Sequence, residues 1–148
     1  MIIGIGTDIV EIYRIQAMWE KHGDRLAERF LAPAELECFQ AVTAKVPYLA
    51  KRVAAKEAAS KALGTGFAQG VSWRHIEVTN DEHGAPRLKL YGEALAKAEQ
   101  RGVTHCHLSL SDEREFAVAF VVLEAAMAIS HDVQSGVSKG SAGKPPAI

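Results

Sequence analysis

One helical segment constrains the fold of this chain more than any other. The stretch from Tyr48 to Leu63 is rich in Ala, Lys, Glu and Leu and contains neither Gly nor Pro inside it, a composition that favours an α-helix. Gly64 follows at the place where a left-handed C-terminal cap belongs. Because most of the non-polar side chains in this segment are Ala, we expect other elements to approach the helix closely.

The remaining hydrophobic pattern divides the chain into short elements. Apolar residues at spacings of three and four indicate helices, and short alternating or apolar runs beside turn residues indicate strands. The predicted strands are Met1–Gly6, His75–Thr79, Arg87–Tyr91, His105–Leu110 and Phe116–Leu123, and the predicted shorter helices are Ile12–His22, Arg25–Leu31, Pro33–Val42 and Glu93–Gln100. Asp24 is expected to cap the second helix, and Pro47 to end the region before the long one. Adjacent strand pairs predict an α+β fold with a mainly antiparallel sheet packed with helices.

The length and the composition divide the chain into one domain and a tail. A chain of 148 residues corresponds to about one domain. We assign residues 1–128 to that domain. From 129 to 148 Ser, Gly, Lys and Pro dominate and aromatic residues are absent, so burial cannot offset the entropy of ordering, and we expect a flexible C-terminal tail.

The overall charge and the cysteines exclude several classes of protein. A formal net charge of -1 gives no global field for nucleic acid or for an anionic membrane surface. The two cysteines, Cys38 and Cys106, form neither a disulfide framework nor a metal-binding pair of neighbours. Neither a signal peptide nor an apolar stretch approaching the roughly 18 residues of a membrane span is visible. We therefore expect a cytoplasmic protein.

The long helix and the first strand together suggest a site for a metal and a phosphate. Glu57 and Lys61 are four residues apart and share a helix face, a pattern that on its own is more often a solvated ion pair than a functional site. The glycines that follow, Gly64 and Gly66, could lie close to a phosphate. Mg²⁺ uses one or two protein carboxylates together with phosphate oxygens and water, and Asp8 at the end of the first strand is the natural second carboxylate.

A second polar pattern lies in the fourth predicted strand. His105 and His107 alternate with apolar residues and share a face with Ser109 and Ser111. Two histidines could ligate a metal, but no further ligand pattern makes a zinc site specific. We interpret this pattern as an ordinary polar face.

Five segments, taken in order, resemble the small, single-domain 4'-phosphopantetheinyl transferases, the holo-[acyl-carrier-protein] synthase family. They are GIGTDIVEIYRI, RFLAPAEL, AKRVAAKEAASKALGTG, NDEHGAPRLKLYGEA and HLSLSDEREFAVAFVVLE. The similarity runs from Met1 to about Glu124, and the first and third segments are highly specific as a pair. The tail is not part of the pattern.

The resemblance implies a reaction and its partners. Coenzyme A donates its 4'-phosphopantetheine arm to a serine of apo acyl carrier protein, adenosine 3',5'-bisphosphate is released, and the holo carrier supports fatty acid biosynthesis. The reaction requires Mg²⁺, with Mn²⁺ as a possible substitute because both ions suit oxygen ligands. The family's compact members form homotrimers with active sites between neighbouring subunits, so a homotrimer is expected here.

The resemblance also implies roles for individual residues. Asp8 and Glu57 correspond to the metal ligands, and Lys61 to the lysine that neutralises or protonates the leaving phosphate. The general base is either Glu57 itself or a metal-bound water. The residues expected to contact coenzyme A are Arg52, Ser60, Lys61, Gly64, Thr65, Pro86 and His107.

The helix Ile12–His22 resembles the family's docking surface for the carrier protein. Arg14, Met18 and Arg25 are expected to meet an acidic helix of the carrier. For Glu11 we favour a structural role as a cap of this helix over a role near the metal. Asp112 stands where many relatives have a histidine, so no function is assigned to it.

Two other functions are compatible with parts of this pattern. A magnesium-dependent nucleotide pyrophosphatase could use the same carboxylates, but it typically carries several glutamates on one helix, and this helix offers only Glu57 at the site. A non-catalytic binder of acyl carrier protein predicts loss of Asp8, Glu57 or Lys61, and all three are present. The sequence therefore favours the transferase.

Overall fold

The computed structural model describes residues 1–127, so the boundary at residue 128 and the predicted tail at 129–148 lie outside the described residues. In chain order the elements are β1 (Ile2–Glu11), α1 (Ile12–His22), α2 (Asp24–Phe30), α3 (Pro33–Ala41), α4 (Lys45–Leu63), the 3₁₀ turn η1 (Trp73–His75), β2 (Ile76–Asn80), β3 (Pro86–Leu90), α5 (Gly92–Gln100), β4 (His105–Asp112) and β5 (Phe116–Glu124). Among these residues, no helix is both long and apolar enough to cross a membrane.

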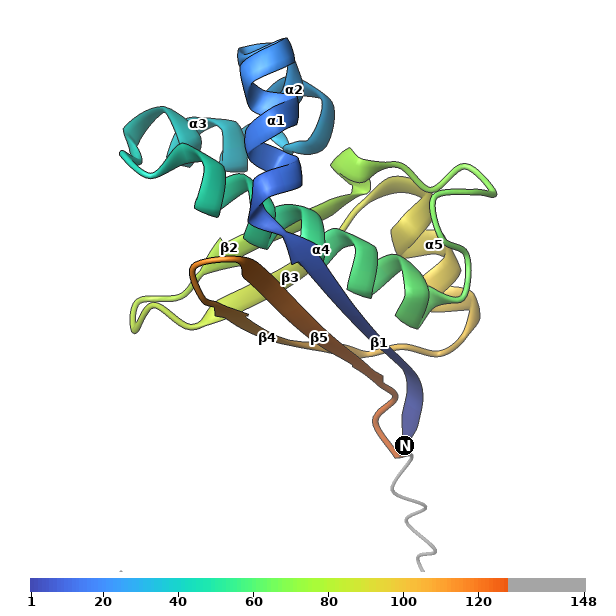
Figure 1. Ribbon diagram of the computed structural model, residues 1–148. Coiled ribbons are helices and arrows are strands. Elements are labelled where there is room, and N and C mark those ends of the chain that lie inside the picture. Colours follow the sequence, from blue (N-terminus) through green and yellow to red (C-terminus); the bar gives the residue numbers. More distant parts are fainter. Residues whose placement is uncertain (128–148) are drawn as a thin grey trace, which may run out of the picture.

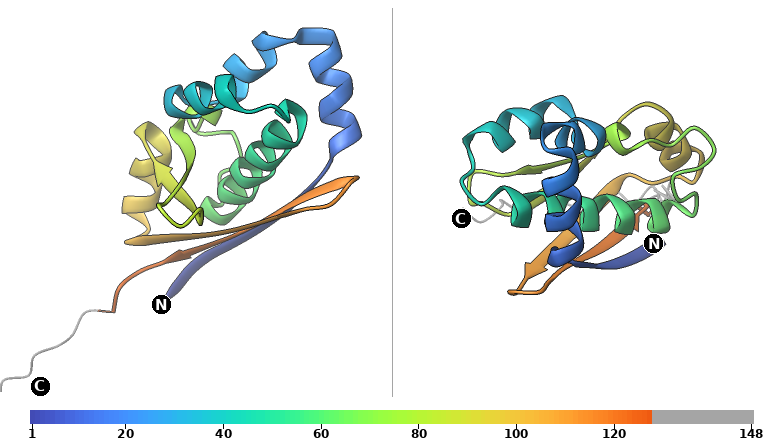
Figure 2. Two further views of the ribbon diagram at one scale, coloured as in Figure 1. Left: turned by 90° about the vertical axis from the view of Figure 1, so that its left-hand side faces the viewer. Right: turned by 45° about the horizontal axis from the view of Figure 1, so that its top comes forward.

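The strands form two antiparallel units, which confirms the predicted α+β class. A three-stranded sheet has the order β1-β5-β4, and β2 and β3 form a separate hairpin. Helix α4 crosses one face of the three-stranded sheet, and α1, α2 and α3 gather beyond the N-terminal half of that helix (Figure 1). Turning the molecule shows that, within residues 1–127, no other element covers the opposite face of the sheet (Figure 2).

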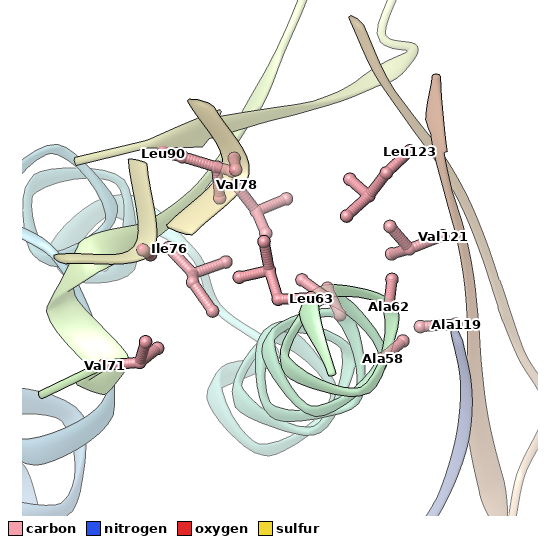
Figure 3. Packing of buried hydrophobic residues seen from close by; sticks show 14 of the residues in the cluster. Ala58, Ala62, Leu63, Val71, Ile76, Val78, Leu90, Ala119, Val121 and Leu123 are labelled. Carbon is pink, nitrogen blue, oxygen red and sulfur yellow. The ribbon is translucent and has the colours of Figure 1, made fainter. Parts of the chain in front are cut away.

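Helix α4 is buried between the sheet and the hairpin. Figure 3 shows Ala58 and Ala62 facing Ala119 and Val121 of β5, while Leu63 lies between the sheet and the hairpin residues Ile76, Val78 and Leu90. Small side chains on the sheet side let the helix backbone lie close to the strands. The close approach expected from the Ala-rich sequence is therefore confirmed.

A second apolar cluster joins α1, α2 and α3 to the first half of α4. Its buried members include Ile15, Leu26, Phe30, Phe39 and Leu49. Aromatic contacts reinforce it: the Trp19 ring meets the Phe39 ring edge-on, with their centroids 5.5 Å apart. This cluster holds the three short helices on α4, next to the end of β1.

The first strand is longer than its glycines suggested. We predicted a strand over Met1–Gly6, but β1 continues through Asp8 to Glu11. Gly4 and Gly6 do not end the strand; they face α4, and a Cβ on Gly6 would collide with the carbonyl oxygen of Ala58. The glycines are therefore required by the crossing of strand and helix, and Asp8 lies within the strand, opposite Ala119.

Three predictions about helix ends are wrong. Helix α4 begins at Lys45 and not at Tyr48, because Pro47 lies in the first helical turn, where a missing N–H breaks no helical hydrogen bond. Asp24 is the first residue of α2 and not its cap, since Gly23 occupies the N-cap position. Glu11 stands at the N-cap position of α1, but its side chain makes no capping hydrogen bond.

Candidate active site

The crossing of β1 and α4 brings a carboxylate and a lysine together. Lys61 Nζ lies 2.8 Å from Asp8 Oδ1 and also donates to the carbonyl oxygen of Thr7 at 3.0 Å. Asp8 is on the strand face that carries Gly6, and Lys61 is one residue from Ala62 on the helix. The side chains of Lys61 and Asp8 are 52% and 15% exposed, so the pair lies at the edge of the crossing and is open to solvent.

A second carboxylate lies one helical turn before Lys61. Burial raises the pKa of Glu57, the negative charge of Asp8 raises it further, and the positive charge of Lys61 acts in the opposite direction. The repulsion from Asp8 shows that the two carboxylates are close enough to interact. The predicted ion pair of Glu57 with Lys61 is replaced by the Asp8–Lys61 pair, which leaves Glu57 beside two charged neighbours.

These three side chains share one pocket of about 330 Å³. Charged and apolar residues both line it. The complete lining is Asp8, Ile9, Val10, Arg14, Ile15, Met18, Phe30, Val53, Glu57, Lys61 and Trp73. The pocket therefore offers two carboxylates, two cations and a large apolar surface to one ligand.

An aromatic group forms part of the pocket's apolar surface. The Trp73 ring stacks on Phe67, with a centroid separation of 3.8 Å and an interplanar angle of 18°, and meets the Phe30 ring edge-on at 4.6 Å. Sequence reasoning did not single out Phe30 or Trp73. Phe30 comes from α2 and Trp73 from η1, outside the β1 and α4 segments that identified the site. No periodic pattern in the sequence indicates that their rings line a pocket.

The residues predicted to dock the carrier protein adjoin this pocket. Arg14 and Met18 line it from α1. Arg25 instead lines a smaller neighbouring groove, together with Met18, His22, Leu26 and Arg29. Met18 lines both the pocket and the groove, so the three predicted docking residues lie on one continuous surface.

Arg52 and Pro86 are brought near each other at another place. Arg52 is 7% exposed, its guanidinium lies 4.1 Å from the centroid of the Tyr48 ring, and Nη2 donates to Asn80 Oδ1 at 3.2 Å. Asn80 is the β2 residue paired with Pro86 in the hairpin. Within residues 1–127 the Arg52 Nε has no hydrogen-bond partner. Neither Arg52 nor Pro86 is among the residues that line the pocket with Glu57.

Ser60, Gly64 and Thr65 lie at the C-terminal end of α4. Ser60 is fully buried, and its hydroxyl donates to the carbonyl oxygen of Glu57 at 2.8 Å. Gly64 has the left-handed φ of 75° expected of a helix cap. Thr65 follows it, and the Thr65 hydroxyl donates to the carbonyl oxygen of Gly66. Coenzyme A contacts of these residues stay predictions.

His107 lies on the opposite face of the sheet from Asp8. His107 Nε2 is 2.7 Å from Glu124 Oε2, and this bond lowers the pKa of the Glu124 carboxyl. His105 is on the same exposed face, as the alternation of the strand predicted. A single chain therefore does not bring His107 to the pocket with Glu57.

Asp112 lies at the end of β4, and its Oδ1 is 3.6 Å from Lys51 Nζ of α4.

The donors near Asp8 suit a hard cation that completes its coordination with other oxygens. Among residues 1–127, three or more His, Cys, Asp or Glu side chains are nowhere arranged as a metal-binding group. Two adjacent carboxylates are the number that Mg²⁺ commonly takes from protein when phosphates and water supply the rest. A cation there would also relieve the repulsion from Asp8 that, after burial, raises the pKa of Glu57.

Comparison with known proteins gives one consistent result. Residues 4–126 match the family model of the 4'-phosphopantetheinyl transferase superfamily. The chain is 55% identical over 123 residues to a holo-[acyl-carrier-protein] synthase from Halorhodospira halophila, covering 83% of this chain and 98% of the relative. It is 54% identical over 124 residues to the synthase of Photobacterium profundum, covering 84% of this chain and 98% of the relative.

Solved structures show the same similarity. The holo-[acyl-carrier-protein] synthase of Neisseria meningitidis superposes with a TM-score of 0.78 at 48% identity, covering 84% of this chain and 99% of its own. The synthase of Bacillus anthracis, solved in complex with CoA (3',5'-ADP), has a TM-score of 0.72 at 41% identity, covering 85% of this chain and 99% of its own.

Proposed function

Because the chain belongs to the 4'-phosphopantetheinyl transferase superfamily, we propose that it transfers 4'-phosphopantetheine from coenzyme A to a serine of apo acyl carrier protein. The products are holo acyl carrier protein, which then serves fatty acid biosynthesis, and adenosine 3',5'-bisphosphate. The observation that carries this proposal is the convergence of Asp8, Glu57 and Lys61 in one pocket where β1 crosses α4.

Asp8 and Glu57 are the residues that would hold the metal ion. Support comes from their shared pocket and from the mutual repulsion that a divalent cation would remove. We propose Mg²⁺ as this ion, with Mn²⁺ as an alternative that has the same preference for oxygen ligands. When bound, such an ion neutralises pyrophosphate charge as a Lewis acid.

Glu57 and Lys61 supply the acid–base and charge-neutralising groups for the transfer between the two substrates. The serine oxygen forms a bond to the phosphorus that carries the pantetheine arm, while the bond from that phosphorus to the leaving bisphosphate breaks. Glu57 is the base that the pocket offers for the serine proton. Lys61 places its ammonium beside the leaving phosphate, whose new charge it neutralises. Positioning and charge account for most of the catalysis in this kind of reaction.

The acceptor would approach from the side of α1. Arg14 lines the pocket, Arg25 lines the neighbouring groove, and Met18 lines both. A cationic surface with an apolar centre suits an acidic helix of a carrier protein. Charge complementarity of this kind accelerates encounter more than it increases affinity.

We further propose a homotrimer. Ile5, Ile9 and Phe120 on the uncovered face of the sheet are 61%, 64% and 44% exposed, more apolar surface than a monomer normally leaves in water. His107 lies on that same face, away from Glu57, so a second copy is needed to bring the two predicted sets of coenzyme A contacts together. We place the enzyme in the cytoplasm, where its two cysteines stay reduced.

The test of the reaction is intact mass spectrometry of apo acyl carrier protein after incubation with this protein, coenzyme A and Mg²⁺. The expected result is a gain of one phosphopantetheine mass that EDTA abolishes. Hydrolysis of coenzyme A without modification of the carrier would replace the proposal by a pyrophosphatase. If the protein binds the carrier but changes neither the carrier nor coenzyme A, even with carrier from the same organism, the proposal would be replaced by that of a non-catalytic binder.

A further inference from the structure

Glu35 and Lys56 form a buried ion pair that the proposed reaction does not use. Both side chains are 0% exposed, and Lys56 Nζ lies 2.5 Å from Glu35 Oε1. Burial raises the pKa of Glu35 and lowers the pKa of Lys56, and their mutual attraction opposes both shifts. A buried pair of this kind contributes little net stability, because desolvation offsets the attraction. Its contacts therefore need another explanation.

The pair connects three elements around one short turn. Glu35, in the first turn of α3, accepts hydrogen bonds from the backbone N–H of Ala32 at 2.9 Å and of Val78 at 3.3 Å. Lys56, in the middle of α4, donates to the backbone carbonyl of Trp73 at 3.0 Å. Trp73 and Val78 lie on either side of the junction between η1 and β2. The pair thus holds this junction against both helices.

The turn held in this way carries the aromatic wall of the active-site pocket. Trp73 lines the pocket together with Glu57, and Lys56 is the residue directly before Glu57 in the helix. A second tether holds the same turn to α2, because Arg74 Nη2 donates to the carbonyl oxygen of Glu28 at 2.8 Å. The two adjacent helix residues therefore have separate tasks: Glu57 faces the pocket, and Lys56 holds the turn that forms its wall.

We propose that Glu35 and Lys56 are positioning residues of the active site, which act by holding Trp73 at a fixed place in the wall of the pocket that Asp8, Glu57 and Lys61 also line. This inference rests on the proposed transferase function for its kinetic test. Trp73 forms part of the apolar lining of the pocket, and a displacement of the reactants by about 1 Å can cost about 100-fold in rate. The ion pair supplies the fixed geometry and takes no part in the transfer itself.

The test uses a double variant, because Lys56→Met alone leaves an unpaired buried carboxylate and is expected to fold poorly. Glu35→Gln combined with Lys56→Met removes both charges and keeps an acceptor oxygen for one of the two backbone donors, since Ala32 and Val78 bond to different oxygens of Glu35. We expect kcat/KM to fall by about 10- to 100-fold. The matched control is Tyr48→Phe, which removes a buried hydrogen bond to the Glu35 carbonyl without touching Trp73, and we expect it to keep kcat/KM.

A cycle with Trp73→Leu separates positioning from a general structural role. If the pair acts through Trp73, adding the double variant to Trp73→Leu causes no further loss of kcat/KM. A loss that multiplies with that of Trp73→Leu would overturn the proposal, as would full activity of the double variant. Equal unfolding temperatures for the double variant and Tyr48→Phe exclude a loss caused by unfolding.

Fluorescence tests the same inference independently of the reaction. The chain has two tryptophans, so a Trp19→Phe background leaves Trp73 as the sole reporter. We expect acrylamide to quench Trp73 more strongly in the double variant than in the parent. Unchanged quenching would show that the ion pair does not hold Trp73, whether or not the protein proves to be a transferase.

Discussion

At the scale of single residues, the site depends on charges that the fold brings together. Burial and then the negative charge of Asp8 raise the pKa of Glu57, and Lys61 opposes this rise while it bonds to Asp8. Asp8 and Lys61 pair at an edge open to solvent, where ion pairs contribute no more than about 1 kcal/mol to stability. The arrangement is therefore better explained by what it binds than by what it stabilises.

Arg14 provides the prediction at this scale. In Arg14→Ala we expect the KM for acyl carrier protein to rise several-fold, because the pocket lining loses a positive charge that attracts the carrier. The KM for coenzyme A should change much less. Steady-state kinetics with each substrate varied in turn measures both, with Lys97→Ala on α5 as the control. Equal increases in the two constants would contradict a docking role.

At the scale of elements, the decisive feature is the contact of β1 with α4. Motif and spacing identified Asp8, Glu57 and Lys61, and alternation identified most strands. The extent of β1 was missed, because glycines commonly end strands and the partner that requires Gly6 lies far along the chain. Phe30 and Trp73 were missed for the same reason, since their place in the pocket depends on tertiary packing and not on any local pattern.

Gly6→Ala tests this contact. The added Cβ would collide with the carbonyl oxygen of Ala58, so strand and helix must separate. We expect a loss of about 1–3 kcal/mol in the free energy of unfolding, as for other overpacked sites. The kcat should fall as well, because Asp8 moves away from Lys61. Urea unfolding and kinetics, with Glu99→Ala on the exposed side of α5 as control, measure both. Wild-type stability in Gly6→Ala would refute the close crossing.

The hairpin that carries Asn80 and Pro86 should respond to pH through Asp81. The Arg87 guanidinium and the backbone N–H of Ala85 hold the pKa of Asp81 below its usual value. The pKa of Asp81 is lower in the folded protein than in the unfolded chain. Its hydrogen bonds therefore stabilise the hairpin at pH values above the usual aspartate pKa, and this stabilisation is lost as acid protonates Asp81. We expect the hydrogen-exchange protection of the Ala85 amide to fall on acidification in the wild type. In Asp81→Asn the protection of this amide should be low already at neutral pH and should change less on acidification. If the variant showed the same pH dependence as the wild type, the role assigned to Asp81 would be contradicted.

At the scale of the whole molecule, residues 1–127 of one chain leave a sheet face uncovered and keep His107 apart from the pocket with Glu57. The uncovered face of the sheet combines Ile5, Ile9 and Phe120 with His107, whereas Asp8 and Glu57 lie on the other side of that sheet. In the proposed assembly, association of copies through this face would bury the apolar residues and place His107 at the contact between copies. Stability, assembly and activity should therefore depend on one another.

Phe120→Lys tests that dependence. We expect native mass spectrometry of the wild type to show three copies of the 16.0 kDa chain, and the variant to be monomeric and to bind coenzyme A poorly. Leu95→Lys on α5 is the matched control, since Leu95 is 40% exposed and Phe120 44%. A variant that stays trimeric, or a monomer with full coenzyme A affinity, would contradict the proposed assembly.

The most direct test of the whole account is the rate of holo-carrier formation by Glu57→Gln over a range of Mg²⁺ concentrations. We expect the variant to unfold at nearly the wild-type temperature but to lose about 100-fold or more in kcat, with a higher requirement for Mg²⁺, because a metal ligand has been removed from an otherwise intact helix face. Glu99→Gln on the exposed side of α5 should behave as the wild type. Near-full activity of Glu57→Gln at low Mg²⁺ would contradict the assignment of the pocket between β1 and α4 as the catalytic metal site.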